Sequence, residues 1–242
     1  SFLKGLDDSI LKERIEEYVG YDPVCIIVAR GEKIPEYLLE KADESGIPVL
    51  STEISTTRFS SMLLNYLEEK LAPVKVIHGV LVDIYGIGVL IRGESGIGKS
   101  ETAIELVKRG HRLVADDIIE IKKVGELRLS GSAPNNSRYF LEMRGIGIIN
   151  VKTLFGAGAV KHDSPINLTI KLEKWQEGEE YERLGIDNRK TEIMDLEIDE
   201  IVIPVKPGRN LALVLEVAAM NYRMKTMGYN AAIDFTENIT NR

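Results

Sequence analysis

The stretch VLIRGESGIGKSETAIELVKRG, residues 89–110, decides the fold of the larger part of this chain. Its pattern predicts an apolar strand, a glycine-rich loop and a helix that stops at Gly110. A chain of this length matches G-x-x-x-x-G-K-[ST] by chance on the order of one time in a hundred. The flanking strand and helix are the context that this motif requires. We therefore predict a phosphate-binding loop, with the motif carried by Gly93, Gly98, Lys99 and Ser100.

The residue types of the loop suit a nucleoside triphosphate. Glycines let successive backbone N–H groups face phosphate oxygens, and the helix N-terminus adds partial positive charge. Lys99 supplies a mobile cation, and Ser100 offers a hydroxyl to Mg²⁺. The predicted nucleotide-binding residues are Gly93, Glu94, Ser95, Gly96, Ile97, Gly98, Lys99 and Ser100.

Working outward from the loop, the chain predicts an α/β protein of two domains, residues 1–73 and residues 74–242. The smaller domain alternates helices and strands: helices at 10–19, 35–46 and 56–71, and strands at 23–30 and 47–52. The larger domain contains the loop, a long helix from about Asn210 to Met227, and strands at 89–92, 112–117, 118–123, 146–151, 166–173 and 200–205.

Composition excludes several classes of function. The formal net charge is −7, so the chain lacks the basic field of a non-specific nucleic-acid binder, and we expect no nucleic-acid partner. No apolar run approaches the roughly 20 residues of a membrane helix, and the start is not a signal peptide, so we expect no membrane association. The single Cys25 forms no internal disulfide, which favours the cytoplasm.

Two adjacent carboxylates, Asp116 and Asp117, end the strand predicted after the loop helix. In an open α/β sheet, strand ends of this kind face the ligand. One carboxylate can steer Mg²⁺ through water while the other accepts a proton from an attacking hydroxyl. A solvated Asp-Asp turn is the alternative. No N-K-x-D motif is present, which weakens the interpretation as a switch GTPase.

Other polar residues are ambiguous from their types alone. Glu142, two residues before Arg144, is equally a metal ligand or a surface ion-pair partner. Arg209 follows a proline-rich turn. This turn either presents the Arg209 cation to a phosphate or is only a structural loop. His78 lies among apolar residues, which favours a satisfied core histidine, and Arg183 favours a solvated ion pair. The remaining histidines, predicted to lie on the surface, are His111 and His162.

Several segments taken together resemble the bacterial HPr kinase/phosphorylase family. The long phosphate-loop segment and RGIGIINVKTLFGAGAV, residues 144–160, are the most specific pair. The other segments, all in the family's order, are TTRFSS, KLAP, IHGVLVDIYGIGVLI, YERLGID, PVKPGRN and VAAMNYR.

The resemblance implies a catalytic domain similar to phosphoenolpyruvate carboxykinase, joined to a smaller N-terminal domain in a homohexamer. Family members use ATP and Mg²⁺ to phosphorylate a serine of the phosphocarrier HPr, which links sugar uptake to gene regulation. They use inorganic phosphate to remove that phosphoryl group and release pyrophosphate. Family N-terminal domains are usually longer than residues 1–73, so we expect the start of this domain to be missing.

The resemblance also implies roles by position. Lys99 would steady the β- and γ-phosphates, and Ser100 with Glu142 would hold the metal. Asp117, with Asp116 beside it, would take the serine proton in the forward reaction and return it in reverse. The family's catalytic positions also match His78 and Arg183, against the two structural interpretations above, and the segment containing Arg209 matches the part associated with dephosphorylation. The departures from the family pattern are Met143 and Lys206, and the second makes phosphorolysis the less certain activity.

Two other functions stay open from the sequence. The first is a phosphate-loop kinase of a small metabolite, which would phosphorylate a free hydroxyl compound without any protein acceptor. The second is a non-catalytic, nucleotide-gated binding module, which would bind ATP tightly even after Asp117→Asn and turn over no acceptor.

Overall fold

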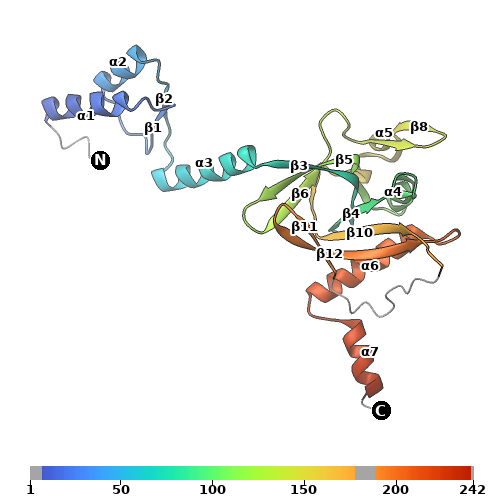
Figure 1. Cartoon of the computed structure of the whole chain (residues 1–242). Helices are drawn as coiled ribbons and strands as arrows, with labels where there is room; N and C mark the ends of the chain where they lie inside the picture. The colour runs from blue at the N-terminus through green and yellow to red at the C-terminus, as the bar shows by residue number, and fades with distance from the viewer. Residues whose placement is uncertain (1–6, 178–188, 241–242) are drawn as a thin grey trace. The chain divides into compact units, whose positions relative to one another are not determined.

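The computed structural model of the protein describes residues 7–177 and 189–240 (Figure 1). Its contacts divide the chain into two compact units, Ser1–Lys70 and Leu71–Arg242. The boundary lies three residues before the predicted one, at the end of a helix rather than in the turn around Pro73. No described helix is long and apolar enough to cross a membrane.

The N-terminal unit has the predicted order of helix, strand, helix, strand, helix. These elements are α1 (Asp8–Gly20), β1 (Ile26–Val28), α2 (Glu36–Glu44), β2 (Val49–Ser51) and α3 (Thr56–Leu71). The two short strands pair in parallel. Their small core comes from the apolar faces of α1 and α2, with Ile15, Val19, Ile26, Leu38, Ala42 and Ile47 buried together.

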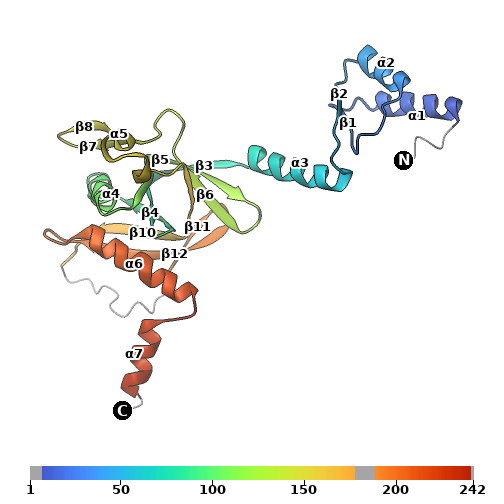
Figure 2. The ribbon, with the colours of Figure 1, turned by 180° about the vertical axis from the view of Figure 1, so that it is seen from behind.

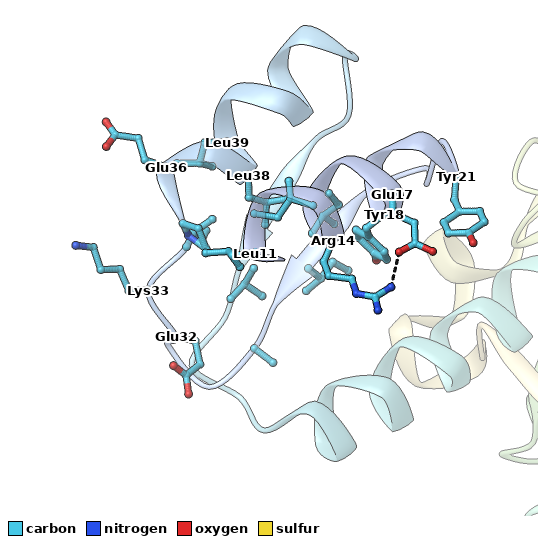
Figure 3. A pocket seen from close by; sticks show the side chains of 17 residues that line it. Leu11, Arg14, Glu17, Tyr18, Tyr21, Glu32, Lys33, Glu36, Leu38 and Leu39 are labelled. Carbon is cyan, nitrogen blue, oxygen red and sulfur yellow. Dashed lines mark hydrogen bonds and ion pairs between the residues drawn. The ribbon is translucent and has the colours of Figure 1, made fainter. Parts of the chain in front are cut away.

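An open apolar groove of about 1330 Å³ lies in this unit, between α1 and the segment that joins β1 to α2 (Figure 3). Tyr18 and Leu39 line it, and an ion pair of 2.7 Å between Arg14 and Glu17 lies at its edge. None of the predicted site residues lines this groove. The volume of this groove therefore does not identify it as the site of the predicted reaction.

The C-terminal unit is built on an eight-stranded mixed sheet of order β11-β12-β10-β4-β3-β5-β6-β9. The strands β4, β10 and β12 are parallel, and the other pairings are antiparallel. The strands are β3 (Val74–Ile84), β4 (Ile87–Gly93), β5 (Arg112–Val124), β6 (Arg128–Ser132), β9 (Asp163–Pro165), β10 (Leu168–Lys174), β11 (Lys190–Ile193) and β12 (Leu196–Val205).

Two helices, α4 (Lys99–Lys108) and α6 (Leu211–Thr226), cover one face of this sheet (Figure 2). Alternate residues of β3 and β4 point into this core, because successive side chains of a strand face opposite sides. Leu81 and Leu90 point the other way, into a second core that includes Leu129 of β6 and Ile193 of β11. The loop helix α4 is thus held rigidly against the sheet.

The remaining elements surround the sheet. A separate hairpin is formed by β7 (Phe140–Met143) and β8 (Gly147–Asn150), and α5 (Val151–Phe155) follows it directly. The strand predicted at 146–151 is therefore shorter, because Asn150 caps α5 by accepting a hydrogen bond from the Thr153 N–H at 3.0 Å. A ten-residue helix after Gly228, α7 (Ala231–Thr240), was not predicted.

One strand prediction was wrong in a way that matters for function. The segments at 112–117 and 118–123 were expected to be two strands separated after the Asp-Asp pair, but they form the single strand β5. Pairing with β3 continues through the carboxylates, with Asp116 opposite Val80 and Asp117 opposite Gly79. Asp116 and Asp117 therefore lie within a continuous ladder and are held by its hydrogen bonds.

Candidate active site

The glycine-rich loop connects β4 directly to α4. Gly93 is the last residue of the strand, and the helix begins at Lys99 after Gly98. Gly98 has a φ of 101°, a left-handed conformation that glycine adopts without steric cost. This local geometry explains why the motif needs glycine immediately before its lysine, and it directs the first N–H groups of α4 toward the loop interior.

The ammonium group of Lys99 lies against the loop backbone. Its Nζ donates to the carbonyl oxygens of Gly93 and Glu94, both at 2.9 Å. These two bonds hold the positive charge where a phosphate chain enclosed by the loop would pass. The role predicted for Lys99, which is to steady the β- and γ-phosphates, stays a prediction.

The carboxylate of Asp116 lies beside the start of α4 and is only 8% exposed. Ser100 Oγ donates to Asp116 Oδ1 at 2.8 Å, and the Glu142 N–H donates to Oδ2 at 3.1 Å. Burial raises the pKa of the Asp116 carboxyl above its ordinary value of 3.8; the two hydrogen bonds oppose this shift, and the charge of Asp117 adds to it. Within the described ranges, no cationic side chain pairs with Asp116.

Asp117 lies on the exposed side of the same strand, next to His78 of β3. The distance from His78 Nδ1 to Asp117 Oδ1 is 3.5 Å, and both side chains are more than 70% exposed. The interpretation of His78 as a core residue was therefore wrong. Asp117 has a φ of 64°, which is uncommon for a residue other than glycine and is typical of strained positions at functional sites.

The β7–β8 hairpin reaches both the loop and the buried carboxylate. The backbone of Glu142 contacts Asp116, and Arg144 Nη2 donates to Ser95 Oγ of the loop at 3.0 Å. The Glu142 side chain is exposed at the same edge. Residue types alone left the role of Glu142 open, and only the family resemblance implied that Glu142 holds the metal and that the segment containing Arg144 serves both reactions. The contact between Arg144 and Ser95 was not predicted, because hairpin-to-loop contacts across 49 residues have no local signal.

A second hollow, of about 880 Å³, opens beside the start of the loop. His78, Arg92, Glu94 and Lys174 are among its lining residues, and Glu94 pairs with Lys174 at 2.8 Å. His78, which pairs with Asp117, lies on its wall, but Asp117 itself is not among its lining residues.

Of the two predicted catalytic arginines, only Arg209 lies among the described residues. Arg209 lies in the connection from β12 to α6, where its Nη1 donates to the Pro204 carbonyl oxygen at 3.0 Å. Arg183 lies outside the described residues. The structure thus brings Ser100, Asp116 and the Glu142 backbone together and pairs His78 with Asp117.

The prediction that His111 lies on the surface was wrong, because the end of α4 is anchored by a buried charge cluster. His111 Nε2 lies 2.8 Å from Glu216 Oε1 of α6, and the ring packs edge-on against Tyr85. Arg109 donates to Glu216 at 2.6 Å, and this bond is the main reason that the pKa of the Glu216 carboxyl is lowered. His162, by contrast, is exposed as predicted.

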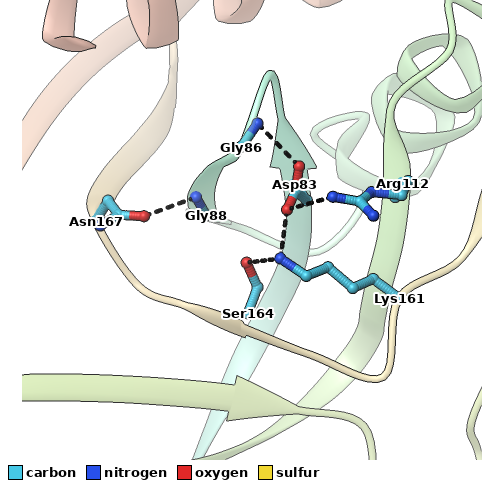
Figure 4. A network of polar contacts seen from close by, with 7 residues as sticks. All are labelled: Asp83, Gly86, Gly88, Arg112, Lys161, Ser164 and Asn167. Carbon is cyan, nitrogen blue, oxygen red and sulfur yellow. Dashed lines mark hydrogen bonds and ion pairs between the residues drawn. The ribbon is translucent and has the colours of Figure 1, made fainter.

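A third buried carboxylate, Asp83 near the end of β3, was not singled out from the sequence (Figure 4). It accepts from Lys161 Nζ at 2.6 Å, from Arg112 Nη2 at 3.2 Å and from the Gly86 N–H at 3.0 Å. Beside it, Asn167 Oδ1 accepts from the Gly88 N–H at 2.9 Å. An acidic residue inside the apolar run VLVDIYG was the available signal for a buried, paired charge.

The donor set of the site suits a hard divalent cation that also binds phosphate. No group of three or more His, Cys, Asp or Glu side chains that could enclose a metal occurs in the part of the chain that the structure describes. Ser100 and Asp116 instead offer oxygen ligands at one edge of the loop. Mg²⁺ is commonly bound in this way, by one or two protein oxygens with waters and phosphates completing its octahedron.

These features together define the class of protein: the fold and the site are those of a phosphoryl-transfer enzyme of the kinase type. Two family models match nearly the whole chain, "HPr Serine kinase N terminus" over residues 1–67 and "HPr Serine kinase C-terminal domain" over residues 69–239. The chain therefore belongs to the HPr kinase/phosphorylase family.

Individual relatives agree with the family models. An HPr kinase/phosphorylase of Caldanaerobacter subterraneus is 52% identical over 99% of this chain and 78% of its own length. One from Bacillus cytotoxicus is 54% identical over 99% of this chain and 77% of its own length. The solved structure of the Hpr(Ser) kinase/phosphatase from Coxiella burnetii is 36% identical, with a TM-score of 0.60, over 66% of this chain and 98% of that one.

Proposed function

We propose that this protein transfers the γ-phosphoryl group of ATP to a serine of the phosphocarrier HPr, and that it also removes that group with inorganic phosphate. Membership of the family and the printed names of its relatives support this proposal. The observation that carries it is the pair of adjacent carboxylates. Asp116 is buried and accepts a hydrogen bond from Ser100, and Asp117 is exposed beside His78.

In this proposal the loop residues 93–100 bind the triphosphate. Backbone N–H groups at the start of α4 face the phosphate oxygens, and Lys99 moves its charge from the loop carbonyls onto the β- and γ-phosphates. Ser100 and Glu142 would hold Mg²⁺, and the buried Asp116 carboxylate, which accepts from Ser100 Oγ, would steer it through water. When bound, the metal neutralises negative charge on the phosphate chain.

In the forward reaction, Asp117 accepts the proton of the serine hydroxyl as the serine oxygen bonds to the γ-phosphorus. The bond from that phosphorus to the β,γ-bridging oxygen breaks, and ADP leaves. His78 positions the Asp117 carboxylate, from which it lies 3.5 Å away. Asp117 suits the role of base because it faces solvent, where the acceptor arrives.

In the reverse reaction, an oxygen of inorganic phosphate bonds to the phosphorus of phosphoserine. The bond between phosphorus and the serine oxygen breaks, Asp117 returns the proton to that oxygen, and pyrophosphate is released. The same loop charges serve both directions because inorganic phosphate takes the place of the β-phosphate of ADP, so its attacking oxygen lies where the β,γ-bridging oxygen was. Catalysis of both reactions by one carboxylate follows from microscopic reversibility.

The wider setting of the proposal comes from the family resemblance. It comprises a homohexamer, a cytoplasmic location, catalytic roles for Arg183 and Arg209, and control of carbon use through the phosphorylation state of HPr.

The test is a phosphorylation assay with HPr, ATP and Mg²⁺, followed by mass, after which excess phosphate is added and pyrophosphate is measured. Asp117→Asn is expected to slow both steps by about 10²–10⁴-fold, since it removes the general base. Asp163→Asn is the matched control, because Asp163 also lies exposed beside a histidine, at 3.4 Å from His162, but on β9.

The outcomes separate this proposal from its alternatives. Phosphoserine that forms, is lost with pyrophosphate release and depends on Asp117 supports it. Phosphorylation of a free hydroxyl compound in place of HPr indicates a small-metabolite kinase. Tight ATP binding that survives Asp117→Asn, with no turnover of any acceptor, indicates a non-catalytic binding module.

A further inference from the structure

The connection from β12 to α6, residues 206–210, leaves the sheet at the same edge as the phosphate loop. The strands β4, β10 and β12 are parallel neighbours, so their carboxyl ends lie along one edge. The phosphate loop follows β4, and the connection follows β12. In open α/β sheets, ligands bind at this edge. The connection therefore lies on the ligand side of the sheet.

The connection is a tight turn with little conformational freedom. The Arg209 N–H donates to the Lys206 carbonyl oxygen at 3.1 Å, across a Pro-Gly pair. Gly208, the second residue of that pair, has a φ of 84°, as the third position of a type II turn requires. The backbone of Arg209 is thus fixed relative to Asn210, the residue that follows it.

A side-chain contact ties this turn to the helix that follows the phosphate loop. Asn210 caps α6, because its Oδ1 accepts from the Leu213 N–H at 2.9 Å. The other end of the same amide is used as well, since Nδ2 donates to Glu105 Oε1 of α4 at 2.9 Å. Both polar atoms of the Asn210 side chain are therefore engaged, and they join the turn to α4 and to the first turn of α6.

Packing of α6 on α4 does not depend on the hydrogen bond between Asn210 and Glu105. The two helices share a core whose fully buried members include Leu106, Ala212 and Leu215. A second polar contact joins them beyond the end of α4, where Arg109 donates to the buried Glu216 at 2.6 Å. A hydrogen bond at the surface adds little to such an interface. The bond from Asn210 to Glu105 therefore acts locally, on the position of the turn.

Arg209 is the cation that this turn carries. Its side chain is exposed, and the bond to the Pro204 carbonyl oxygen uses one of its five N–H donors. Among residues 7–177 and 189–240, no carboxylate forms an ion pair with Arg209. A guanidinium without a carboxylate partner, held at the ligand edge of the sheet, suits a doubly charged phosphate.

We propose that Glu105 is a positioning residue for phosphorolysis, which holds the 206–210 turn through Asn210 and so fixes Arg209 where inorganic phosphate binds. This inference rests on the proposed function, in which Arg209 has a catalytic role. The dependence is stronger in the reverse reaction. In the forward reaction the loop holds the β-phosphate as part of ATP, whereas inorganic phosphate is a separate substrate that depends on every cation it contacts.

The experiment changes the two partners of the hydrogen bond and measures both reactions. Glu105→Ala removes the acceptor, and Asn210→Asp keeps the helix cap but places two carboxylates against each other. Each variant is expected to raise the KM for inorganic phosphate by about tenfold, the effect of losing one hydrogen bond to a charged group. The kcat of the kinase reaction and the affinity for ATP should stay within about twofold of the wild type.

Two further variants test whether the hydrogen bond itself matters. Glu105→Gln keeps an acceptor oxygen for the Asn210 amide, so its KM for phosphate should be close to that of the wild type. Combining Glu105→Gln with Asn210→Asp reverses the bond, because the glutamine amide then donates to the new carboxylate. This double variant should recover most of the loss seen in Asn210→Asp alone.

The matched control is Glu197→Ala. Glu197 is an exposed carboxylate that pairs with Lys190 at 2.7 Å, at the end of β12 opposite to the turn. Urea unfolding of each variant checks the fold, and it separates a loss of stability from a change in the KM for phosphate.

Three results would overturn the role of Glu105. The first is a Glu105→Ala variant with the same KM for phosphate as Glu197→Ala. The second is a double variant no better than Asn210→Asp alone. The third is an equal loss of kinase activity, phosphorolysis and ATP affinity, since this pattern indicates support of α4 alone.

The proposed function can fail separately from this inference. If the wild-type protein does not phosphorylate HPr, the proposed function fails, and calorimetric titration with inorganic phosphate still tests Glu105. Weaker phosphate binding by Glu105→Ala than by Glu197→Ala supports its positioning role, and equal binding by the two variants overturns it.

Discussion

Asp83 and Asp116 are two buried carboxylates of the same sheet, 3% and 8% exposed, and they have opposite electrostatic environments. Asp83 ends β3, and Asp116 lies in the neighbouring strand β5. The pKa of the Asp83 carboxyl is held below its ordinary value, and that of Asp116 is raised above it. The difference comes from their partners, since both side chains are almost fully removed from water.

Asp83 is surrounded by the cations that it needs. Burial alone would raise its pKa, but the hydrogen bond and charge of Lys161, the Gly86 N–H and the charge of Arg112 outweigh that effect (Figure 4). The network joins β3, β5 and the segment before β9, and so fixes the turn between β3 and β4. A buried carboxylate with its own cations is a structural element.

Asp116 has hydrogen-bond donors, but no cationic side chain of residues 7–177 and 189–240 pairs with it. The Ser100 hydroxyl and the Glu142 N–H stabilise its charge only partly. Ionised Asp116 therefore lowers the stability of the fold, and a neighbouring cation would remove this cost. A divalent metal bound with the nucleotide would supply that charge. The comparison teaches that the buried charge of the scaffold is paired within the chain, whereas the buried charge of the site would be paired only by a bound ligand.

Asp116→Asn is expected to have the largest effect, because it removes the buried, unpaired charge of the site. Phosphoryl transfer should fall by about 10²–10³-fold, since the negative charge near the metal is lost. The free energy of unfolding should stay the same or rise by about 1 kcal/mol, because an amide removes the cost of a buried, unpaired charge. Urea unfolding and the HPr assay measure the two. A strongly destabilised Asp116→Asn protein would show that this carboxylate is structural.

Asp83→Asn is expected to have the reverse outcome. It leaves Lys161 and Arg112 without their counter-charge. Because both of these side chains reach solvent, we expect a loss of about 2–3 kcal/mol, below the roughly 3–5 kcal/mol of a fully buried pair. ATP affinity of the folded protein should be unchanged. Urea unfolding of Asp83→Asn beside Asp163→Asn, an exposed control, measures the difference. Equal stability of the two variants would contradict the scaffold role.

The site was largely predictable because its signal is local. The loop motif depends on consecutive residues, and its glycine before Lys99 is fixed by backbone conformation. The Asp-Asp pair was found for the same reason, although its strand was not predicted to continue. Strand continuity depends on β3, whose Gly79 and Val80 lie opposite the carboxylates and are distant in sequence.

The scaffold charges were harder to predict because their partners are far apart in the chain. Lys161 is 78 residues from Asp83, and Glu216 is 105 residues from His111. His111 follows the loop helix in a polar stretch, so sequence alone favoured the surface, whereas packing of α6 on α4 buries it. Such pairings follow from tertiary structure, which overrides the local character of the sequence.

The smallest expected effect is the pH dependence of the stability that the two carboxylates contribute. The stability from Asp83, whose folded pKa is lowered, is present above the ordinary value of 3.8 and is lost as the pH falls through the folded pKa. For Asp116, whose folded pKa is raised, stability is present below 3.8 and is lost as the pH rises through the folded pKa.

Relative to the wild type at neutral pH, Asp83→Asn should therefore be less stable and Asp116→Asn equally or more stable. Both differences should shrink, by a few tenths of a kcal/mol to about 1 kcal/mol, when urea unfolding is repeated at about pH 3.5. At this pH the Asp116 carboxyl is mostly neutral in both the folded and the unfolded chain, whereas the Asp83 carboxyl approaches the neutral state only in the unfolded chain. Differences that shift in the same direction at both sites would mean that the two carboxylates share one environment, and the contrast between scaffold and site would then fail.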